Sequence, residues 1–470
     1  MSRTPLYDAL LAYADKKTFR GHMPGHKGKP LPCGLSDHLT EIDFTEIDAT
    51  GNLYEGDGPI ALAEANAASY YGASNALFLT GGSSQGVLTM LSRFAGKTVL
   101  FDRNSHKSTA SAMALFDITP RYIIPEPFPT FHVSGRISPA ALDAELAAHA
   151  DIAAVFVTSP NYYGVIQDIP SLAAVCHDHG IMLLVDGAHG AHLTALGIPN
   201  AVKCGADMEV CSFHKTTRAL GQAAVLFAGP KLDPDALRHS AALVGTSSPS
   251  YAVMASIDCA VAELRDHPEN YRAVAQICAD LKKTRIHAET PFDCLFGGDP
   301  SDSIDPKALI DPCRLVVHTA GCGLSGRKAA SILTHTYGVE PEMADNGNVV
   351  FILTDADTKA DLDRLGDAIA QLGKPYAEGM RSAMQICAVP PLPKRVCSPR
   401  EAYFSLAESV PVSHCEGRIA AETVVVYPPG VLILAPGERI DKKTIVYLLE
   451  NGYNSSKESS AEKCLRVLQI

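Results

Sequence analysis

Two neighbouring stretches, IMLLVDGAH (181–189) and MEVCSFHK (208–215), decide the fold that we expect for this chain. Each contains a short, mostly apolar run, which is typical of a strand buried on both faces of a sheet, and each ends on residues that can carry chemistry. In open α/β sheets, ligands bind at the carboxyl ends of the strands. We therefore expect Asp186 and Lys215 to lie close together at one edge of a mainly parallel sheet.

The same alternation of short apolar runs and helix-like stretches extends on both sides of this pair. It predicts a parallel sheet that is covered by helices on both faces. The other expected strands are ALFLT (76–80), TVLFD (98–102), RYIIP (121–125), AAVFVTSP (153–160) and AAVLFA (223–228), and the clearest helices are 84–95, 138–149 and 170–180.

At 470 residues, the chain is too long for a single core, so we expect two or three domains. Residues 1–30, rich in Gly, His and Lys, are predicted to be an extended arm rather than a helix. A large domain is expected over 31–295, a small α+β domain over 296–389, and a C-terminal domain over 390–470, after the Pro-rich segment PPLPKRVCSPR (390–400).

The small domain is expected to open with the polar loop GGDPSDSIDP (297–306) and to contain two strands and two helices. The strands are RLVVHTAG (314–321) and NVVFILT (348–354), and Ser325 opens the first helix. The second helix carries one apolar stripe, made of Leu362, Leu365, Ile369 and Leu372.

Composition and charge exclude several classes of protein. Apolar residues make up 46% of the chain, as in an ordinary globular protein. The formal net charge of -12 argues against nucleic acid or an anionic membrane as the main partner. We find no run of about twenty apolar residues and no signal-peptide pattern. The 13 Cys form no Cys-x-x-Cys pair, which favours reduced thiols in a cytoplasmic enzyme over disulfides or a metal site.

The segment GGSSQG (81–86) lies between an expected strand and an expected helix. Ser83, Ser84 and the N–H groups at the start of that helix can donate hydrogen bonds to a phosphate. Taken alone, such a segment is more often a glycine turn with a serine cap.

Asp186 directly follows four apolar residues, and a carboxylate buried there needs a cationic partner. The protonated pyridine nitrogen of pyridoxal phosphate (PLP) is such a partner, and holding it protonated makes the ring an electron sink. Viewed alone, Asp186 could equally cap a helix or pair with an arginine. His189 either lines the same pocket or is only a loop histidine.

Lys215 follows the next apolar strand, where its amine can form an aldimine with PLP. Ser212 and His214 are placed to reach the cofactor phosphate. An arbitrary lysine at a strand end is usually just solvated. The combination of an aspartate strand, a Ser-x-His-Lys strand and a glycine–serine loop favours the cofactor.

The segment DRNSHKS (102–108) supplies a further candidate, His106, just after an expected strand. An imidazole can stack on the pyridine ring, although it can equally be a turn histidine. Lys107 is a weaker rival to Lys215, because it precedes a helix and does not follow an aspartate strand.

With these residues, the chain closely resembles the Orn/Lys/Arg decarboxylases of PLP fold type I, and in particular the short bacterial group. The resemblance spans nearly the whole chain. Besides the segments already quoted it includes HMPGHKGKP (22–30), FTEID (44–48), TSPNYYGVIQDI (158–169), TSSPSY (246–251), VEPEMAD (339–345), GRIAAE (417–422), YPPG (427–430) and PGE (436–438).

The resemblance implies an aspartate aminotransferase-like large domain and a C-terminal decarboxylase-type domain. It also implies a cytoplasmic homodimer or larger homo-oligomer with shared active sites. Lys215 would form the aldimine, Asp186 would hold the ring nitrogen and His106 would stack on the ring. Ser83, Ser84, Ser212 and His214 would hold the phosphate, together with Ser248 from the other subunit.

The reaction implied is decarboxylation of arginine, lysine or ornithine to the amine, a step of polyamine biosynthesis, with arginine slightly favoured. His214 or Lys215 would protonate Cα, and Glu438 and Asp345 could bind the cationic end of the substrate or only cap turns.

Departures from the usual family pattern at Gly82, at 50–54 and at 415–416 leave open another PLP reaction on the same scaffold, namely transamination, β-elimination or decarboxylation of an unusual amino acid. An aminotransferase would grip the substrate carboxylate with an arginine, so the direction of Arg218 is a check. A non-catalytic binding protein is disfavoured by the intact set of Lys215, Asp186 and His106.

Overall fold

A computed structural model of the chain describes residues 3–128, 130–296, 309–377, 383–384, 386, 389–426, 431–451 and 463–469. The expected polar loop at 297–306 and the YPPG motif at 427–430 lie outside the described residues. Within the described ranges, no helix is long and apolar enough to cross a membrane.

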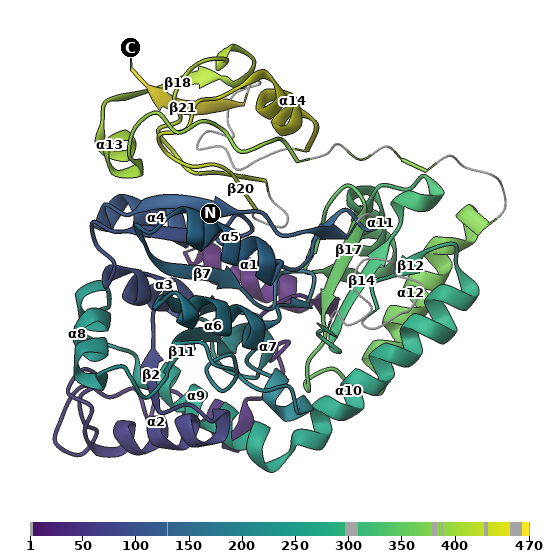
Figure 1. Ribbon diagram of the computed structural model, residues 1–470. Helices are drawn as coiled ribbons and strands as arrows, with labels where there is room; N and C mark the ends of the chain where they lie inside the picture. The colour runs from purple at the N-terminus through teal and green to yellow at the C-terminus, as the bar shows by residue number, and fades with distance from the viewer. Residues whose placement is uncertain are drawn as a thin grey trace.

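A seven-stranded sheet forms the centre of the large domain (Figure 1), and its strand order is β2-β11-β10-β9-β7-β3-β4. Only β11 runs antiparallel to its neighbours, so the prediction of a mainly parallel sheet is confirmed. The strands are β2 (Asn75–Leu79), β3 (Thr98–Asp102), β4 (Thr119–Ile123), β7 (Ile152–Thr158), β9 (Met182–Asp186), β10 (Met208–Ser212) and β11 (Ala224–Ala228).

Apolar side chains alternate between the two faces of this sheet and build two separate cores. On β9, Leu184 belongs to one core, whereas Leu183 and Val185 belong to the other. The first core includes residues of α2 (Gly58–Tyr71), α3 (Gly82–Ser92), α8 (Pro234–Val244), α9 (Tyr251–Asp266) and α10 (Pro268–Asp280); the second includes α5 (Pro139–Ala148) and α6 (Ile169–Asp178). Helices therefore cover both faces, as predicted.

A four-stranded antiparallel sheet forms the small domain, in the order β12-β14-β17-β16. Ser325 caps α11 by accepting a hydrogen bond from the Lys328 N–H, and the expected stripe of α12 is buried. The elements are β12 (Asp293–Cys294), β14 (Arg314–His318), α11 (Gly326–Tyr337), β15 (Val339–Pro341), β16 (Met343–Ala344), β17 (Asn348–Ile352) and α12 (Lys359–Ala377). Strand β13 (Leu309–Ile310) crosses to the large domain and pairs with β8 (Val165–Ile166).

The prediction of a wholly extended N-terminal arm is wrong for Pro5–Ala14, which form helix α1. Proline is compatible with the first turn of a helix, and the following LYDALLAYA consists mostly of good helix formers. The glycines and prolines that suggested an extended arm all lie further on, apart from Pro5. There, β1 (Phe19–Gly21) pairs in parallel with β15.

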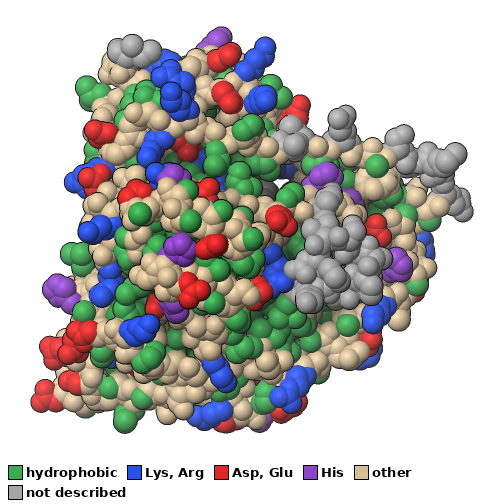
Figure 2. All heavy atoms as spheres, viewed as in Figure 1, with side chains coloured by type: hydrophobic (Ala, Val, Ile, Leu, Met, Phe, Trp, Pro, Cys, Tyr) green, Lys and Arg blue, Asp and Glu red, His purple; other side chains and the backbone are tan. Residues whose placement is uncertain are grey.

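The C-terminal part of the chain packs over α4 (Ser108–Phe116), as Figure 1 shows. Ala110 of α4 shares a small apolar core with Val425, Leu432 and Ala435. This part contains α13 (Pro399–Phe404), β18 (Ala407–Pro411), β19 (Val424–Val426), β20 (Val431–Leu434), α14 (Lys442–Asn451) and β21 (Cys464–Leu468). Acidic and basic side chains are interspersed over the face drawn in Figure 2.

Candidate active site

The carboxyl ends of five strands, β2, β3, β7, β9 and β10, meet at one pocket. The pocket is lined by Ser83, Asn104, His106, Thr158, Tyr162, Asp186, Ala188, His189 and Lys215. Four of these residues, Ser83, His106, Asp186 and Lys215, were expected at strand ends from the sequence. For His189, the sequence left open whether it lines this pocket or is only a loop histidine. The structure therefore brings the main candidates together in one place.

Lys215 lies on the single-turn helix α7 (Phe213–Thr216), which begins directly after β10. Its Nζ atom is 3.2 Å from Nε2 of His189 and 5.6 Å from the centre of the Tyr162 ring. Burial lowers the pKa of Lys215, and nearby Asp186 only partly offsets this effect. A lysine amine with a lowered pKa is easier to deprotonate, as a nucleophilic lysine must be.

Asp186 is the last residue of β9 and is 3% exposed. Its Oδ1 accepts a hydrogen bond from the Ala188 N–H, and the positive charge that acts on it among the described residues is that of Lys215. Burial raises its pKa, against the opposing charge of Lys215. The Asp186 carboxylate is therefore placed to pair with a further positive charge in the pocket.

His106 lies between β3 and α4, and its Nδ1 accepts a hydrogen bond from the Ser108 N–H. Burial and the charge of Lys215 lower its pKa to about 4, so the ring is neutral at physiological pH. A neutral imidazole can stack on an aromatic ring without adding charge. Lys107, the rival lysine, is exposed and stands outside the pocket lining.

The expected phosphate-binding residues are placed unevenly. Ser212 is fully buried and its Oγ has no hydrogen-bond partner in the described part of the chain, whereas Ser83 is half-buried and Ser84 is exposed. His214 donates from Nδ1 to the Ala223 carbonyl, and burial lowers its pKa to about 4. Gly82 has a φ of +71°, and a Cβ there would meet only one atom, at 3.9 Å, so the backbone of this turn is open to a ligand.

These residues fit PLP. The buried carboxylate of Asp186 suits a protonated ring nitrogen, and Lys215, whose pKa is lowered, lines the same pocket. Of the expected phosphate-binding residues, Ser83 lines the pocket, and the Ser212 hydroxyl and the open turn at Gly82 are the further candidates to donate hydrogen bonds to a phosphate.

Arg218, the residue that would favour an aminotransferase, is held by two carboxylates. Its Nε donates to Asp355 at 2.9 Å and its Nη2 donates to Glu263. Arg218 is also absent from the residues that line the pocket of Lys215, so the structure does not direct it at a substrate carboxylate there.

The two substrate candidates are also occupied. Both oxygens of Glu438 accept from Arg103 at 2.9 Å, and Asp345 accepts from Tyr163 at 2.6 Å and from backbone N–H groups of its own turn. Neither lines the pocket of Lys215. Ser248 is exposed outside that pocket, so any contact with PLP would have to be made in another subunit.

Sequence reasoning missed four residues around Lys215: Asn104, Thr158, Tyr162 and Arg314. The first three follow or end predicted strands, so the rule that ligands bind at strand ends could have found them. Arg314 lies in the small domain, and no local pattern connects it with the site.

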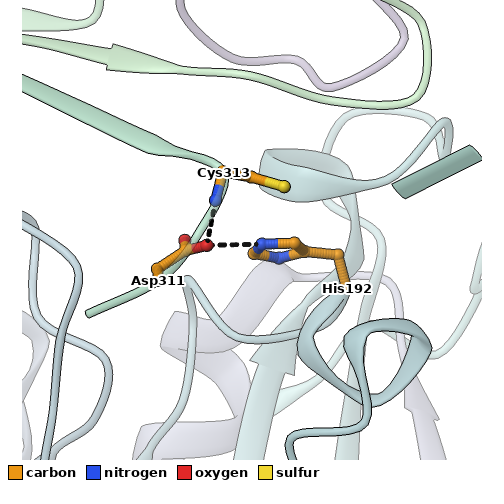
Figure 3. A group of neighbouring side chains, drawn as sticks. All are labelled: His192, Asp311 and Cys313. Atoms are coloured by element: carbon orange, nitrogen blue, oxygen red, sulfur yellow. Dashed lines mark hydrogen bonds and ion pairs between the residues drawn. The ribbon is translucent and has the colours of Figure 1, made fainter. Parts of the chain in front are cut away.

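His192, which follows His189 by three residues, forms a buried cluster with Asp311 and Cys313 (Figure 3). These residues offer metal-ligand atoms within 4.8 Å of one another. Oδ1 of Asp311, however, already accepts from His192 Nε2 and from the Cys313 N–H, both at 2.9 Å. These hydrogen bonds account for the closeness of the three residues, while Nδ1 of His192 has no partner among the described residues.

A mainly parallel sheet with a buried aspartate and a lysine at the ends of adjacent strands defines the class of PLP enzymes of fold type I. Solved structures agree with this assignment. The chain is similar to the constitutive lysine decarboxylase of Escherichia coli (TM-score 0.76, 19% identity, 99% of this chain and 82% of that one). It also matches pyridoxamine-pyruvate aminotransferase from Mesorhizobium loti (TM-score 0.57, 14% identity, 76% of this chain and 92% of that one).

Within this class, the chain belongs to the Orn/Lys/Arg decarboxylase family. The family's major-domain model matches residues 4–295 and its C-terminal model matches residues 382–456. An arginine decarboxylase of Halalkalibacterium halodurans is 30% identical over 462 residues, covering 96% of this chain and 93% of the relative. One from Bacillus subtilis is 29% identical, covering 95% and 93%. The predicted class, a decarboxylase of basic amino acids, is confirmed.

Proposed function

We propose that this enzyme decarboxylates arginine to agmatine, with PLP held by Lys215 and Asp186. The observation that carries the proposal is that Lys215, an amine of lowered pKa, and the buried carboxylate of Asp186 line one pocket. The choice of arginine is supported by two relatives that are named arginine decarboxylases and are covered almost end to end. A place in polyamine biosynthesis follows from that product.

Bound PLP supplies the electron sink that accepts the electrons released with carbon dioxide. Asp186 would hold the protonated ring nitrogen, and Lys215 would carry the cofactor. His106 would stack on the ring, while Ser83, Ser84 and Ser212 would bind the phosphate. His214 or Lys215 would supply the proton to Cα. His189 lines the pocket and contacts Lys215.

The engagement of Arg218 by two protein carboxylates also favours decarboxylation over transamination. A tight ion pair with the substrate carboxylate would stabilise the ground state and oppose loss of carbon dioxide. Because Arg218 is bound by Asp355 and Glu263, that penalty does not arise from it.

The cofactor assignment is tested with purified native protein and the Lys215→Ala variant. The native protein is expected to be yellow, and borohydride is expected to fix PLP onto Lys215. Lys107→Ala is the matched control and should keep its colour. A Lys215→Ala variant that still bonds covalently to PLP would contradict the assignment.

The reaction is tested with a panel of amino acids, by following carbon dioxide and amine release. Arginine is expected to give agmatine faster than lysine gives cadaverine or ornithine gives putrescine. Release of a keto acid in place of carbon dioxide would favour an aminotransferase, and no reaction with any of the three would refute the proposal.

We also propose that the enzyme is a homodimer or larger homo-oligomer in which Ser248 reaches the phosphate of a neighbouring subunit. The exposure of Ser248 outside its own pocket supports this arrangement. Ser248→Ala is expected to weaken PLP binding without changing the oligomer in sedimentation experiments. If the native protein sediments as a monomer, the shared site is excluded. A cytoplasmic location stays a prediction.

A further inference from the structure

Arg314 is a fully buried cation that reaches from the small domain to the loop after Asp186. It begins β14, and its Nη2 lies 3.3 Å from Nδ1 of His189 and 3.7 Å from Oδ2 of Asp311. Among the residues that the structure describes, its Nε and Nη1 atoms have no hydrogen-bond partner. Burying a guanidinium with so few partners costs free energy, so its retention calls for a role.

The contact with His189 fixes where that ring carries its proton. A guanidinium can only donate hydrogen bonds, so Nδ1 of His189 must accept. The neutral imidazole then holds its single proton on Nε2. Burial, Lys215 and Arg314 all lower the pKa of His189 well below its ordinary value, in agreement with a neutral ring.

The protonated Nε2 in turn faces Lys215 Nζ at 3.2 Å. An N–H group needs an acceptor, and a lysine has one only as the neutral amine, because the ammonium form has no lone pair. The relay from Arg314 through His189 thus disfavours the ammonium form of Lys215.

We propose that Arg314 is a positioning residue for Lys215, which acts through His189 to keep the lysine amine neutral and directed into the pocket. This inference rests on the proposed function, because the neutral amine is the form that bonds to the PLP aldehyde.

Other groups around Lys215 act on the same equilibrium. Asp186 and Glu342 raise the pKa of Lys215, whereas burial lowers it most strongly and the charge of Arg314 lowers it further. His106 and His214, both near Lys215, have pKa values of about 4 and remain neutral. The relay therefore counters two carboxylates, which would otherwise favour the ammonium form.

A second contact fixes the position of Arg314 relative to His189. Asp311 accepts from Nε2 of His192, three residues beyond His189, and its carbonyl accepts from the Arg314 N–H at 3.0 Å. One turn of the small domain, residues 311–314, thus contacts the loop after β9 at both His189 and His192.

The test is the pH dependence of covalent PLP uptake by cofactor-free enzyme, followed by absorbance. Arg314→Met removes donor and charge and is expected to raise the midpoint, which reports the pKa of Lys215, by about one unit. Arg314→Lys, which keeps both, should stay near the native midpoint. In a His189→Phe background, Arg314→Met should have a much smaller effect, because the relay is already broken.

An unchanged midpoint in Arg314→Met, or an equal shift in both backgrounds, would overturn the proposal, since the charge would then act alone or not at all. If Arg314→Met does not fold, nitrogen-15 spectra of histidine-labelled native protein decide, with His189 assigned by its loss in His189→Phe. A protonated Nε2 is expected and a protonated Nδ1 overturns the relay. Failure of the proposed function is distinct, because native Lys215 would then take up no PLP.

Discussion

Glu438 receives two hydrogen bonds of 2.9 Å from Arg103, a residue 335 positions away in the chain. Arg103 stands between Asp102, at the end of β3, and the pocket residues Asn104 and His106. The Glu438 carboxylate also accepts from the Ala435 N–H, so the C-terminal part of the chain fixes the loop that carries His106.

Glu438→Gln is expected to lower the free energy of unfolding by roughly 3 kcal/mol, because it leaves the buried Arg103 without its counter-ion. Turnover should fall equally for every substrate, as His106 loses its support. Urea unfolding and steady-state kinetics measure the two effects. Glu408→Gln, which breaks a partly exposed pair with Arg418, is the control and should cost less than about 1 kcal/mol. A selective rise in KM for arginine at unchanged stability would instead make Glu438 a substrate ligand.

Ser212→Ala is expected to lower the stability of the PLP-bound protein but not that of the cofactor-free protein. None of the described residues forms a hydrogen bond with the Ser212 hydroxyl, so its removal should leave the cofactor-free form as stable as before. The bound form should lose a charged hydrogen bond worth about 2 kcal/mol, or roughly thirtyfold in the Kd of PLP. Thermal melts with and without PLP measure both.

The matched control for this change is Ser256→Ala. Ser256 is also fully buried, but its Oγ donates to the Val253 carbonyl and accepts from the Leu220 N–H. This variant should destabilise both forms alike. An equal loss in both forms for Ser212→Ala would contradict its assignment to the phosphate.

Asp102 predicts a pH dependence of stability. Burial raises its pKa to about 7, whereas an unfolded aspartate titrates near 4. Between about pH 4 and about pH 7, Asp102 is protonated in the folded state but ionised in the unfolded state. Its contribution therefore makes the protein less stable as pH rises from about 4 to about 7. Asp102→Asn has no proton to lose. Its stability relative to native protein should therefore increase over that window, by roughly 4 kcal/mol at most, and level off above it. Urea unfolding across the pH range tests this, and a difference independent of pH would refute it.

Arg218→Met should affect stability and leave the reaction type unchanged. The change leaves the buried carboxylate of Asp355 with Tyr271 as its remaining side-chain donor, at a cost of about 3 kcal/mol. Arg218→Met/Asp355→Asn should recover part of the loss, since no unpaired charge is left. Products are measured as carbon dioxide and keto acid. A large rise in KM at native stability would show that Arg218 binds substrate.

Local patterns in the sequence were enough to predict the sheet and the centre of the site. Buried parallel strands require nearly continuous apolar runs, so Asp186 and Lys215 stand out where those runs end. The same reasoning could not find Arg314, which is 125 positions from His189 and meets it only when two domains pack together. Glu438 shows the opposite error. Its acidic side chain suggested a substrate ligand, and its actual partner, Arg103, lies too far away in the chain to be recognised from a local pattern.

The two contacts between the turn 311–314 and the loop after β9 limit how this chain can be recombined with its relatives. A chimera that exchanged everything after residue 295, where the match to the major-domain model ends, would place a foreign turn against His189 and His192. The turn and the loop must therefore be transplanted as one unit, although more than a hundred residues separate them.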